Sequence, residues 1–263
     1  MTLQVREQHI RRNKATSNIC TAQALLANMT AMYGIWHRAE GLKVIAKRIR
    51  FRTEILRDEF NQMGIKVINH PNNYFDTLTL ACLESGFSSA DYVLSEFHKH
   101  DINLRKISDN LVSLSINETT TIDDLASLIE IFAYMKDEIQ EIGEYLQPDR
   151  FEDIVYRGIP EDLERKTSFM QQEIFNSIYS ETELMRYCTR LADKDYGLAN
   201  GIMPLGSCTM KLNSAVVMMP ITFPGFCNIH PFAPKDQTFG YNYMIKELEI
   251  MLSTITHYAK VSL

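Results

Sequence analysis

The sequence lacks the features that mark several classes of protein. Its 263 residues include only 11 glycines and 8 prolines, which excludes a collagen-like or linker-dominated chain. No apolar run approaches the roughly 20 residues that a membrane-spanning helix requires. The N-terminus is polar and basic, with no hydrophobic stretch behind it, so a secretory signal is not indicated. We therefore expect a globular protein that is neither embedded in a membrane nor secreted.

Positive charge and paired cysteines are also scarce. The formal net charge of −6 gives no positive field for binding a phosphate backbone, so we expect no nucleic-acid partner. The five cysteines are scattered and odd in number, which favours reduced thiols. Cys227 and His230 resemble half of a zinc site, but no second pair stands at a matching spacing, so we expect no metal. Dinucleotide fingerprints, P-loops and nucleophile elbows are absent.

What the sequence does contain is a helical start. Apolar residues recur with helical spacing in 16–57, and a second helical run extends over 41–60, so the pattern predicts two successive helices. Gly64 is expected to end the second helix. Five basic residues of this helix are expected to form a solvated outer face: Lys43, Lys47, Arg48, Arg50 and Arg52.

The next stretch predicts a compact α+β unit. Residues 65–68 and 75–80 alternate as short strands, and Ser88 or Ser89 can cap a following helix. Residues 102–107 and 111–116 again alternate, and a threonine run at 119–121 precedes a long amphipathic helix. The order is strand–strand–helix–strand–strand–helix, which places the chain in the α/β class with a small α+β domain.

The last third of the chain predicts a connection and then helices. Residues 145–165 are polar, acidic and proline-containing, as in a linker, whereas 182–195 and 241–258 have helical patterns. Residues 261–263 begin like a strand with no turn or cap behind them, so we expect a truncated product or a split gene. We also expect exposed apolar surface along 16–36 and 241–258.

The densest cluster of chemically active side chains lies in residues 202–213. Glycine is followed there by hydroxyl, thiol and ammonium groups, which suit an anionic group such as a carboxylate or phosphate. The candidate residues are Ser207, Cys208, Thr209, Met210 and Lys211. His230 joins them, because the prolines that follow it stiffen its segment. A buried loop whose hydroxyls satisfy nearby backbone groups is the alternative.

Two long motifs carry a resemblance to a known family. The first is REQHIRR at 6–12 with KATSNICTAQALLANM at 14–29, and the second is PLGSCTMKLN at 204–213 with NIHPFAP at 228–234. Both are similar to the P-protein of the glycine cleavage system, the pyridoxal-phosphate-dependent glycine decarboxylase. The resemblance covers nearly the whole chain and is weakest over about 61–144.

The resemblance implies a partial fold-type I pyridoxal-phosphate transferase, in which the end of a first half joins the start of a second half. Residues 1–60 would close the first-half large domain, 61–144 would be its small α+β domain, 145–190 a linker and connecting helix, and 191–263 the truncated second-half domain. The family's Schiff-base lysine would lie beyond Leu263. Neither Lys14 nor Lys211 stands in that lysine's motif, so this chain is expected to contain no catalytic residue of its own.

The implied reaction is decarboxylation of glycine and transfer of the remaining aminomethyl group to the lipoyl group of H-protein, with pyridoxal 5′-phosphate as cofactor. The fragment is expected to be inactive alone. The implied partners are lipoylated H-protein, glycine, and the remainder of the P-protein or a companion chain. The implied compartment is bacterial cytoplasm or the mitochondrial matrix. The alternative is a non-catalytic interaction or dimerisation module that pairs with a full-length decarboxylase.

Overall fold

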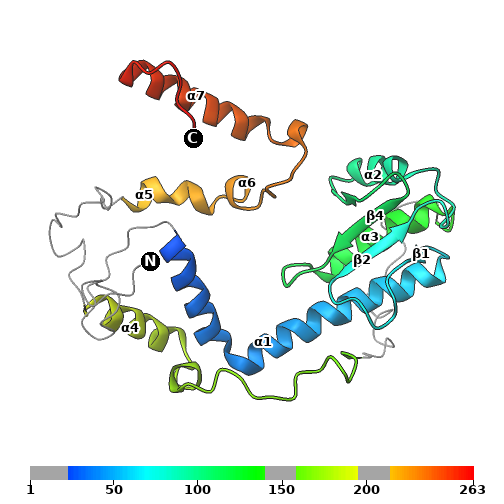
Figure 1. Cartoon of the computed structure of the whole chain (residues 1–263), viewed down its shortest axis with the longest axis horizontal. Helices are drawn as coiled ribbons and strands as arrows, with labels where there is room; N and C mark the ends of the chain where they lie inside the picture. Colours follow the sequence, from blue (N-terminus) through cyan, green and yellow to red (C-terminus); the bar gives the residue numbers. More distant parts are fainter. Residues whose placement is uncertain (1–22, 140–157, 195–213) are drawn as a thin grey trace, which may run out of the picture. The chain divides into compact units, whose positions relative to one another are not determined.

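The structure, a computed structural model, describes residues 23–139, 158–194 and 214–263. The described residues belong to two compact units, one within 23–194 and the other formed by 214–263 (Figure 1). The chain therefore combines a small sheet with helices, as the composition and periodicity predict for the α/β class.

The first unit begins with the long helix α1 (Gln23–Gln62), which is broken at Arg38. Arg38 has φ 57° and ψ −179°, a backbone conformation that residues other than glycine rarely adopt. The break confirms the prediction of two successive helices. At the other end, Gly64 has φ +67° and the Ile65 N–H donates to the Phe60 carbonyl at 2.7 Å, so the predicted glycine stop is confirmed.

The sheet that follows is entirely antiparallel. Its strands are β1 (Lys66–Val67), β2 (Thr77–Ala81), β3 (Arg105–Lys106) and β4 (Leu111–Ser115), in the spatial order β1-β2-β4-β3. In the central pair, Leu78 faces Leu114 and Leu80 faces Val112, while Thr77 faces Ser115. The leucines and Val112 therefore share one face of the central pair, and Thr77 and Ser115 lie on the other.

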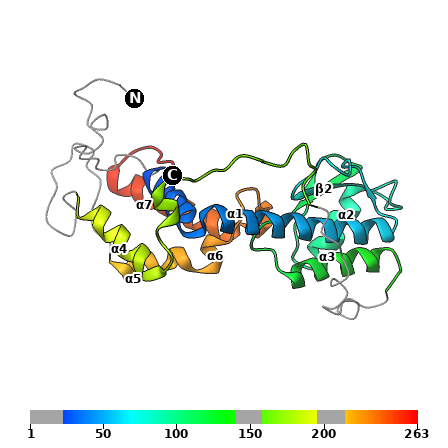
Figure 2. The same ribbon diagram turned by 90° about the horizontal axis from the view of Figure 1, so that it is seen from below.

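Three helices bury that apolar face. The second half of α1 and α3 (Ile122–Met135) run alongside one another, and α2 (Ala90–His98) packs near β3 and β4 (Figure 2). Four side chains at the centre are fully buried: Phe60 and Phe97 from the flanking helices, Phe132 from α3, and Leu78 from the sheet. Because helix and sheet each have one apolar side, the two layers close a single core.

Local capping residues determine where these helices begin. Ser89 caps α2 by accepting from the Tyr92 N–H. Thr121 and Asp124 form a reciprocal capping box at the start of α3, in which each side chain accepts from the other's backbone N–H. The predicted serine and threonine caps are therefore confirmed.

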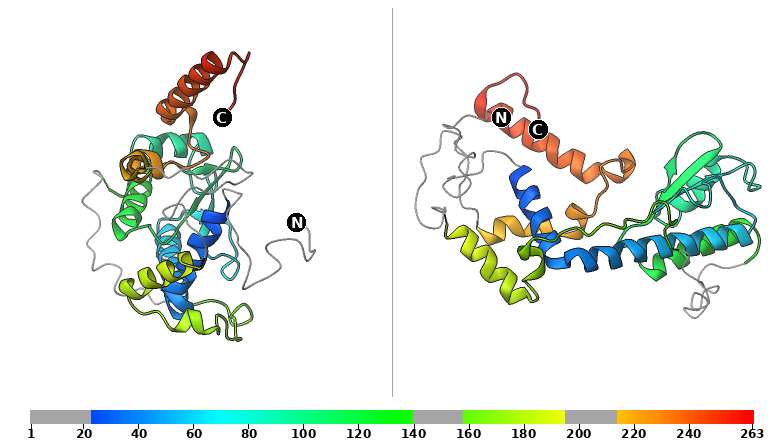
Figure 3. Two further views of the ribbon diagram at one scale, coloured as in Figure 1. Left: turned by 90° about the vertical axis from the view of Figure 1, so that its left-hand side faces the viewer. Right: turned by 60° about the horizontal axis from the view of Figure 1, so that its bottom comes forward.

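Residues 158–180, here called the strap, run along α1 (Figure 3). The strap contains the 3-10 helix η3 (Glu173–Asn176) and leads into α4 (Glu181–Ala192). A Cβ on Gly34 of α1 would meet Met170 and Phe175 of the strap at 3.5 Å each. Close beside the break in α1, the Arg38 guanidinium lies 4.7 Å from the centre of the Tyr179 ring. The strap is thus fitted closely to the broken region of α1.

The second unit is a chain of short helices and one long one. It contains α5 (Ala215–Met218), η4 (Met219–Thr222), α6 (Pro224–Cys227), η5 (Lys235–Gln237) and α7 (Phe239–Thr256). No residue within 214–263 is buried. The exposed apolar side chains of α7 are Phe239, Tyr243, Met244, Ile245, Leu248, Ile250, Met251 and Ile255. The expected exposed apolar surface is confirmed for this helix and for 25–36 of α1, where Leu25, Leu26, Met29, Tyr33 and Trp36 are exposed.

Two sequence expectations need correction. The predicted strands at 65–68 and 102–107 shrink to two residues each, because these edge strands hydrogen-bond to a neighbour on one side only. The expected basic outer face of α1 is wrong at Arg50, whose residue exposure is only 3%. Its guanidinium is buried because it meets a carboxylate and an aromatic ring, which outweighs the ordinary preference of arginine for solvent.

Candidate functional site

The loop predicted to carry chemistry is only partly visible. Ser207, Cys208, Thr209, Met210 and Lys211 lie outside the described residues, as does the first family-like motif up to residue 22. His230 is described, and it follows α6 in the second unit. The structure therefore places one of the six predicted site residues and leaves the grouping of all six a prediction.

His230 has a defined hydrogen bond and an open edge. Its Nδ1 accepts from the backbone N–H of Phe232 at 3.0 Å, and the two rings lie 5.8 Å apart. In the neutral ring, an accepting Nδ1 leaves the proton on Nε2. The side chain is exposed, so Nε2 is available to donate a hydrogen bond to a ligand or a neighbouring carbonyl. The stiff segment after His230 thus presents one donor from a fixed ring.

The described residues do not by themselves form a cradle for pyridoxal phosphate. That cofactor requires a lysine that reaches its aldehyde carbon, together with donors for its phosphate. The two cavities described below contain no lysine in their linings, and His230 lines neither of them. We therefore derive no reaction step through the cofactor from this geometry.

The described residues also contain no clustered metal ligands. Within 23–139, 158–194 and 214–263, no group of three or more His, Cys, Asp or Glu side chains converges to hold an ion. Cys227, the other half of the possible zinc pair, lies near the Thr222 carbonyl and the Asn228 side chain. Among the same residues, none of the helices combines the length and apolar content needed to cross a bilayer.

A polar cluster that includes the buried Arg50 and Glu54 surrounds Tyr74, and the sequence analysis did not predict it. The Arg50 Nε lies 3.1 Å from Glu54 Oε1, and both side chains are almost fully buried. The Arg50 guanidinium stacks 3.7 Å from the centre of the Tyr74 ring, and its Nη1 donates to the Tyr74 carbonyl. Arg57 lies on the same ring at 4.9 Å. The i, i+4 spacing of Arg50 and Glu54 was the available signal for an ion pair on α1.

The described residues form a small cavity at the Tyr74 cluster and a larger one elsewhere in the first unit. One, of about 120 Å³, is lined by Arg50, Arg57, Pro71, Asn72, Tyr74, Gly158 and Pro160. The other, of about 520 Å³, lies between η3 and α4 and is lined by residues that include Glu183, Arg186, Tyr187 and Arg190. In the larger cavity Glu183 is already committed, because it caps α4 and accepts from the backbone N–H groups of Tyr179 and Ser180.

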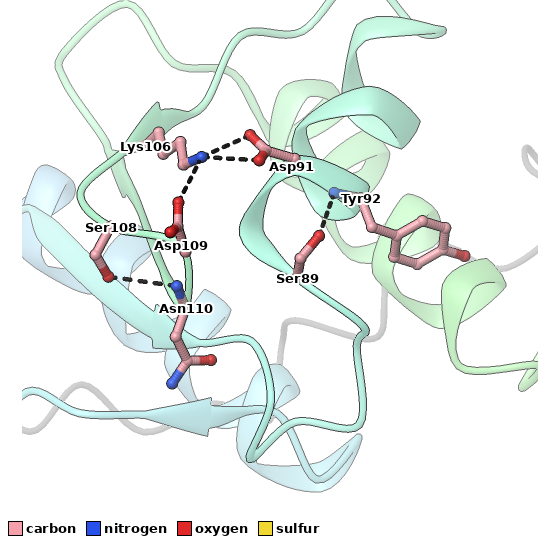
Figure 4. Close-up of polar contacts among 7 residues, drawn as sticks. All are labelled: Ser89, Asp91, Tyr92, Lys106, Ser108, Asp109 and Asn110. Carbon is pink, nitrogen blue, oxygen red and sulfur yellow. Dashed lines mark hydrogen bonds and ion pairs between the residues drawn. The ribbon is translucent and has the colours of Figure 1, made fainter.

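Lys106, Asp91 and Asp109 form an exposed polar group that links a helix and a turn of the first unit. Lys106 Nζ lies 2.8 Å from both carboxylate oxygens of Asp91 and 3.0 Å from Asp109 Oδ1 (Figure 4). The hydrogen bonds that the Lys106 ammonium donates to Asp91 and, to a smaller extent, to Asp109 raise the pKa of this ammonium. These contacts join the first turn of α2 to the turn between β3 and β4. Because the group is exposed, its ion pairs contribute little to stability.

Comparison with known proteins identifies the family of this chain. The family model described as "Glycine cleavage system P-protein" matches residues 1–132, half of the chain. A putative mitochondrial glycine dehydrogenase (decarboxylating) of Schizosaccharomyces pombe is 46% identical over 97% of this chain and 25% of its own length. The enzymes named glycine dehydrogenase (decarboxylating) from Flaveria trinervia and Paraburkholderia xenovorans are 44% and 45% identical over the whole chain, and over 24% and 26% of their own lengths.

These matches agree with the two motifs read from the sequence. The chain spans about a quarter of the length of the curated relatives that it matches, and the similarity extends across all of it. Identity of this level over some 260 residues does not arise without common descent, and the family model covers half of the chain independently. The chain belongs to the glycine cleavage system P-protein family.

Proposed function

We propose that this chain is part of a glycine decarboxylase: it contributes to decarboxylation of glycine with transfer of the aminomethyl group to the lipoyl group of H-protein. The observation that carries the proposal is the 44–46% identity to glycine dehydrogenases (decarboxylating) across this chain. Pyridoxal 5′-phosphate would accept the electron pair that is released when the carbon–carbon bond to the departing carboxylate breaks. The proposed compartment is bacterial cytoplasm or the mitochondrial matrix; in support, one relative is named as mitochondrial and another comes from a bacterium.

Within that enzyme, the chain's own contribution is a binding loop. Ser207 and Thr209 would offer hydroxyls, Lys211 would offer an ammonium, and the glycine before them would let backbone N–H groups of the loop approach an anion. Together these groups suit a carboxylate or phosphate. Cys208 and Met210 would line the same mouth, and His230 would add its Nε2–H from a rigid segment. The Schiff-base lysine is proposed to lie on polypeptide outside this sequence, so the fragment alone is proposed to be inactive.

The domain assignment follows from the same proposal. The small sheet with α2 and α3 would be the small domain of a fold-type I first half, at 61–144. Helix α1 would belong to the end of its large domain, 145–190 would be a linker and connecting helix, and 191–263 would open the second half. The support is the agreement between the α+β elements and the strand–strand–helix repeat expected for 61–144. The break at Arg38 would then lie within the helical end of the large domain.

The exposed apolar helices support a need for further polypeptide. The apolar side chains of 25–36 and those of α7 are exposed, and contiguous exposed apolar side chains usually mark an interaction surface. We propose that the remainder of the P-protein, or a companion chain that carries it, covers them. The same surfaces would serve the alternative function, a non-catalytic module that pairs with a full-length decarboxylase.

A chimera tests the proposal directly. The homologous quarter of the Paraburkholderia enzyme would be replaced by this chain, and release of CO₂ from glycine would be measured with lipoylated H-protein. We expect an active chimera in which Lys211→Gln and His230→Ala each lower kcat/KM at least about tenfold. Lys260→Gln, a change at an exposed lysine, is the matched control and should leave kcat/KM unchanged.

Two outcomes would contradict parts of this account. A folded chimera that binds pyridoxal phosphate yet releases no CO₂ would remove the proposed catalytic contribution, and co-purification of this chain with an intact decarboxylase would then favour the interaction module. An aldimine absorbance band and CO₂ release by this chain alone would show that its own lysines suffice.

A further inference from the structure

The small cavity beside Tyr74 is lined in part by Arg57, whose Nε–H is a hydrogen-bond donor without an acceptor in the described part of the chain. Arg57 Nε is buried and has no hydrogen-bond partner within the described residues. A buried donor without an acceptor normally destabilises the folded state. Arg57 is one of the residues that line the cavity, so a partner for its guanidinium is expected there.

Arg50, the other arginine that lines the cavity, already has partners for its charge and its hydrogen-bond donors. Arg50 is paired with Glu54 at 3.1 Å, donates to the Tyr74 carbonyl and stacks on the Tyr74 ring. Its charge is thus neutralised where it lies. Arg57 differs: its Nη1 donates one long hydrogen bond to the Pro71 carbonyl at 3.4 Å, and its Nε has no hydrogen-bond partner among the described residues.

The orientation of the Arg57 guanidinium selects the chemistry of the missing partner. A guanidinium presents its Nε–H and one terminal N–H along the same edge, in a fork that matches two oxygens of a carboxylate or phosphate. Nη1 is engaged with Pro71, and the Tyr74 ring lies against the guanidinium 4.9 Å away. The edge of the guanidinium that carries the unpartnered Nε–H is therefore suited to bind an oxyanion.

The cavity has room for such a group. Its volume of about 120 Å³ is roughly four times the 30 Å³ that one water molecule occupies in the liquid. Its polar lining includes the exposed side chain of Asn72, whose amide can donate a further hydrogen bond. We propose that this cavity binds a small oxyanion, a phosphate or a carboxylate, on the Nε edge of Arg57.

Inorganic phosphate is the probe for the first test, with the full chain labelled in nitrogen-15. The Arg57 Nε–Hε resonance should shift saturably as phosphate is added at constant ionic strength. Arg57→Lys keeps the charge but removes the forked edge, so it should weaken phosphate binding at least about tenfold by calorimetry. Arg48→Lys, on the exposed surface of the same helix, is the matched control and should bind phosphate like the original chain.

A second variant protects the test against misfolding. Asn72→Asp changes an exposed residue, so folding should persist, yet it places a negative charge at the cavity and should weaken phosphate binding about tenfold. Repeating the titration with acetate distinguishes a phosphate site from a carboxylate site by which anion saturates at the lower concentration. Equal phosphate binding by the original chain, Arg57→Lys and Asn72→Asp would overturn the proposal. So would an Arg57 resonance that no anion shifts, since water alone would then satisfy Nε.

Discussion

The two units of the chain contain similar helices but bury very different amounts of apolar surface. In the first unit, α3 buries Leu125, Leu128, Ile129 and Phe132 against the sheet and α1. In the second unit, α7 is longer and carries as many apolar side chains, yet none of its residues is buried. The difference shows that an amphipathic pattern supplies a surface, and that a facing surface is what converts it into stability.

The largest contrast should come from one phenylalanine in each unit. Phe132 is 0% exposed and packs against the rings of Phe60, Phe87 and Phe97, so Phe132→Ala should lower the free energy of unfolding of the sheet unit by about 3–5 kcal/mol. Phe239 of α7 is 74% exposed, and Phe239→Ala should change it by less than about 0.5 kcal/mol. Urea unfolding followed by circular dichroism measures both. Equal effects would mean that α7 is covered within this chain.

The second contrast uses two ion pairs of α1. Glu54→Gln leaves the buried Arg50 without its counter-charge and should cost about 3 kcal/mol. Glu40→Gln removes the exposed partner of Lys43 and should leave the free energy of unfolding almost unchanged. The same unfolding measurement, repeated in high salt, separates them, because salt screens only the exposed pair. A Glu54→Gln protein as stable as the original would show that Arg50 is solvated.

The third contrast uses the same capping box in two settings. Thr121→Ala removes the cap of α3 and should lower the free energy of unfolding of the sheet unit by about 1 kcal/mol, because α3 is part of the core. Ser180→Ala removes the equivalent cap of α4, which buries no residue. Its effect should appear only as faster amide hydrogen exchange in the first turn of α4. Global destabilisation by Ser180→Ala would contradict that view.

The smallest effect is a pH dependence at the same cap of α4. Backbone hydrogen bonds, chiefly from Tyr179, lower the pKa of the Glu183 carboxyl. A lowered pKa means that the folded state holds the carboxylate more tightly than the unfolded state does. The stabilisation is therefore present above the carboxyl's unfolded pKa and is lost as pH falls through the lower folded value. Hydrogen exchange of the first turn of α4 should accelerate in that acid range relative to α3, and Glu183→Gln should remove the difference.

Much of the first unit was predictable because its signals are local. The Gly64 stop, the Ser89 and Thr121 caps and the helix–strand order depend on residues within a few positions of one another, and all are observed. Arg50 was not predictable from its neighbours in this way. Its burial depends on Tyr74, which is brought to it by the turn between the first two strands. Of the candidate site, only His230 could be placed, and its hydrogen bond to Phe232 is likewise local.

The family was determined by the sequence alone, because its two motifs and the identity across the chain depend on residue order and need no coordinates. The same is true of the helix ends and of the alternation in the central strands. Only the tertiary structure decided which apolar faces are covered, that Arg50 is neutralised in the interior, and that Arg57 Nε is left with a cavity beside it. Those outcomes depend on distant residues meeting, and a linear pattern records which side chains are present without recording which surfaces they meet.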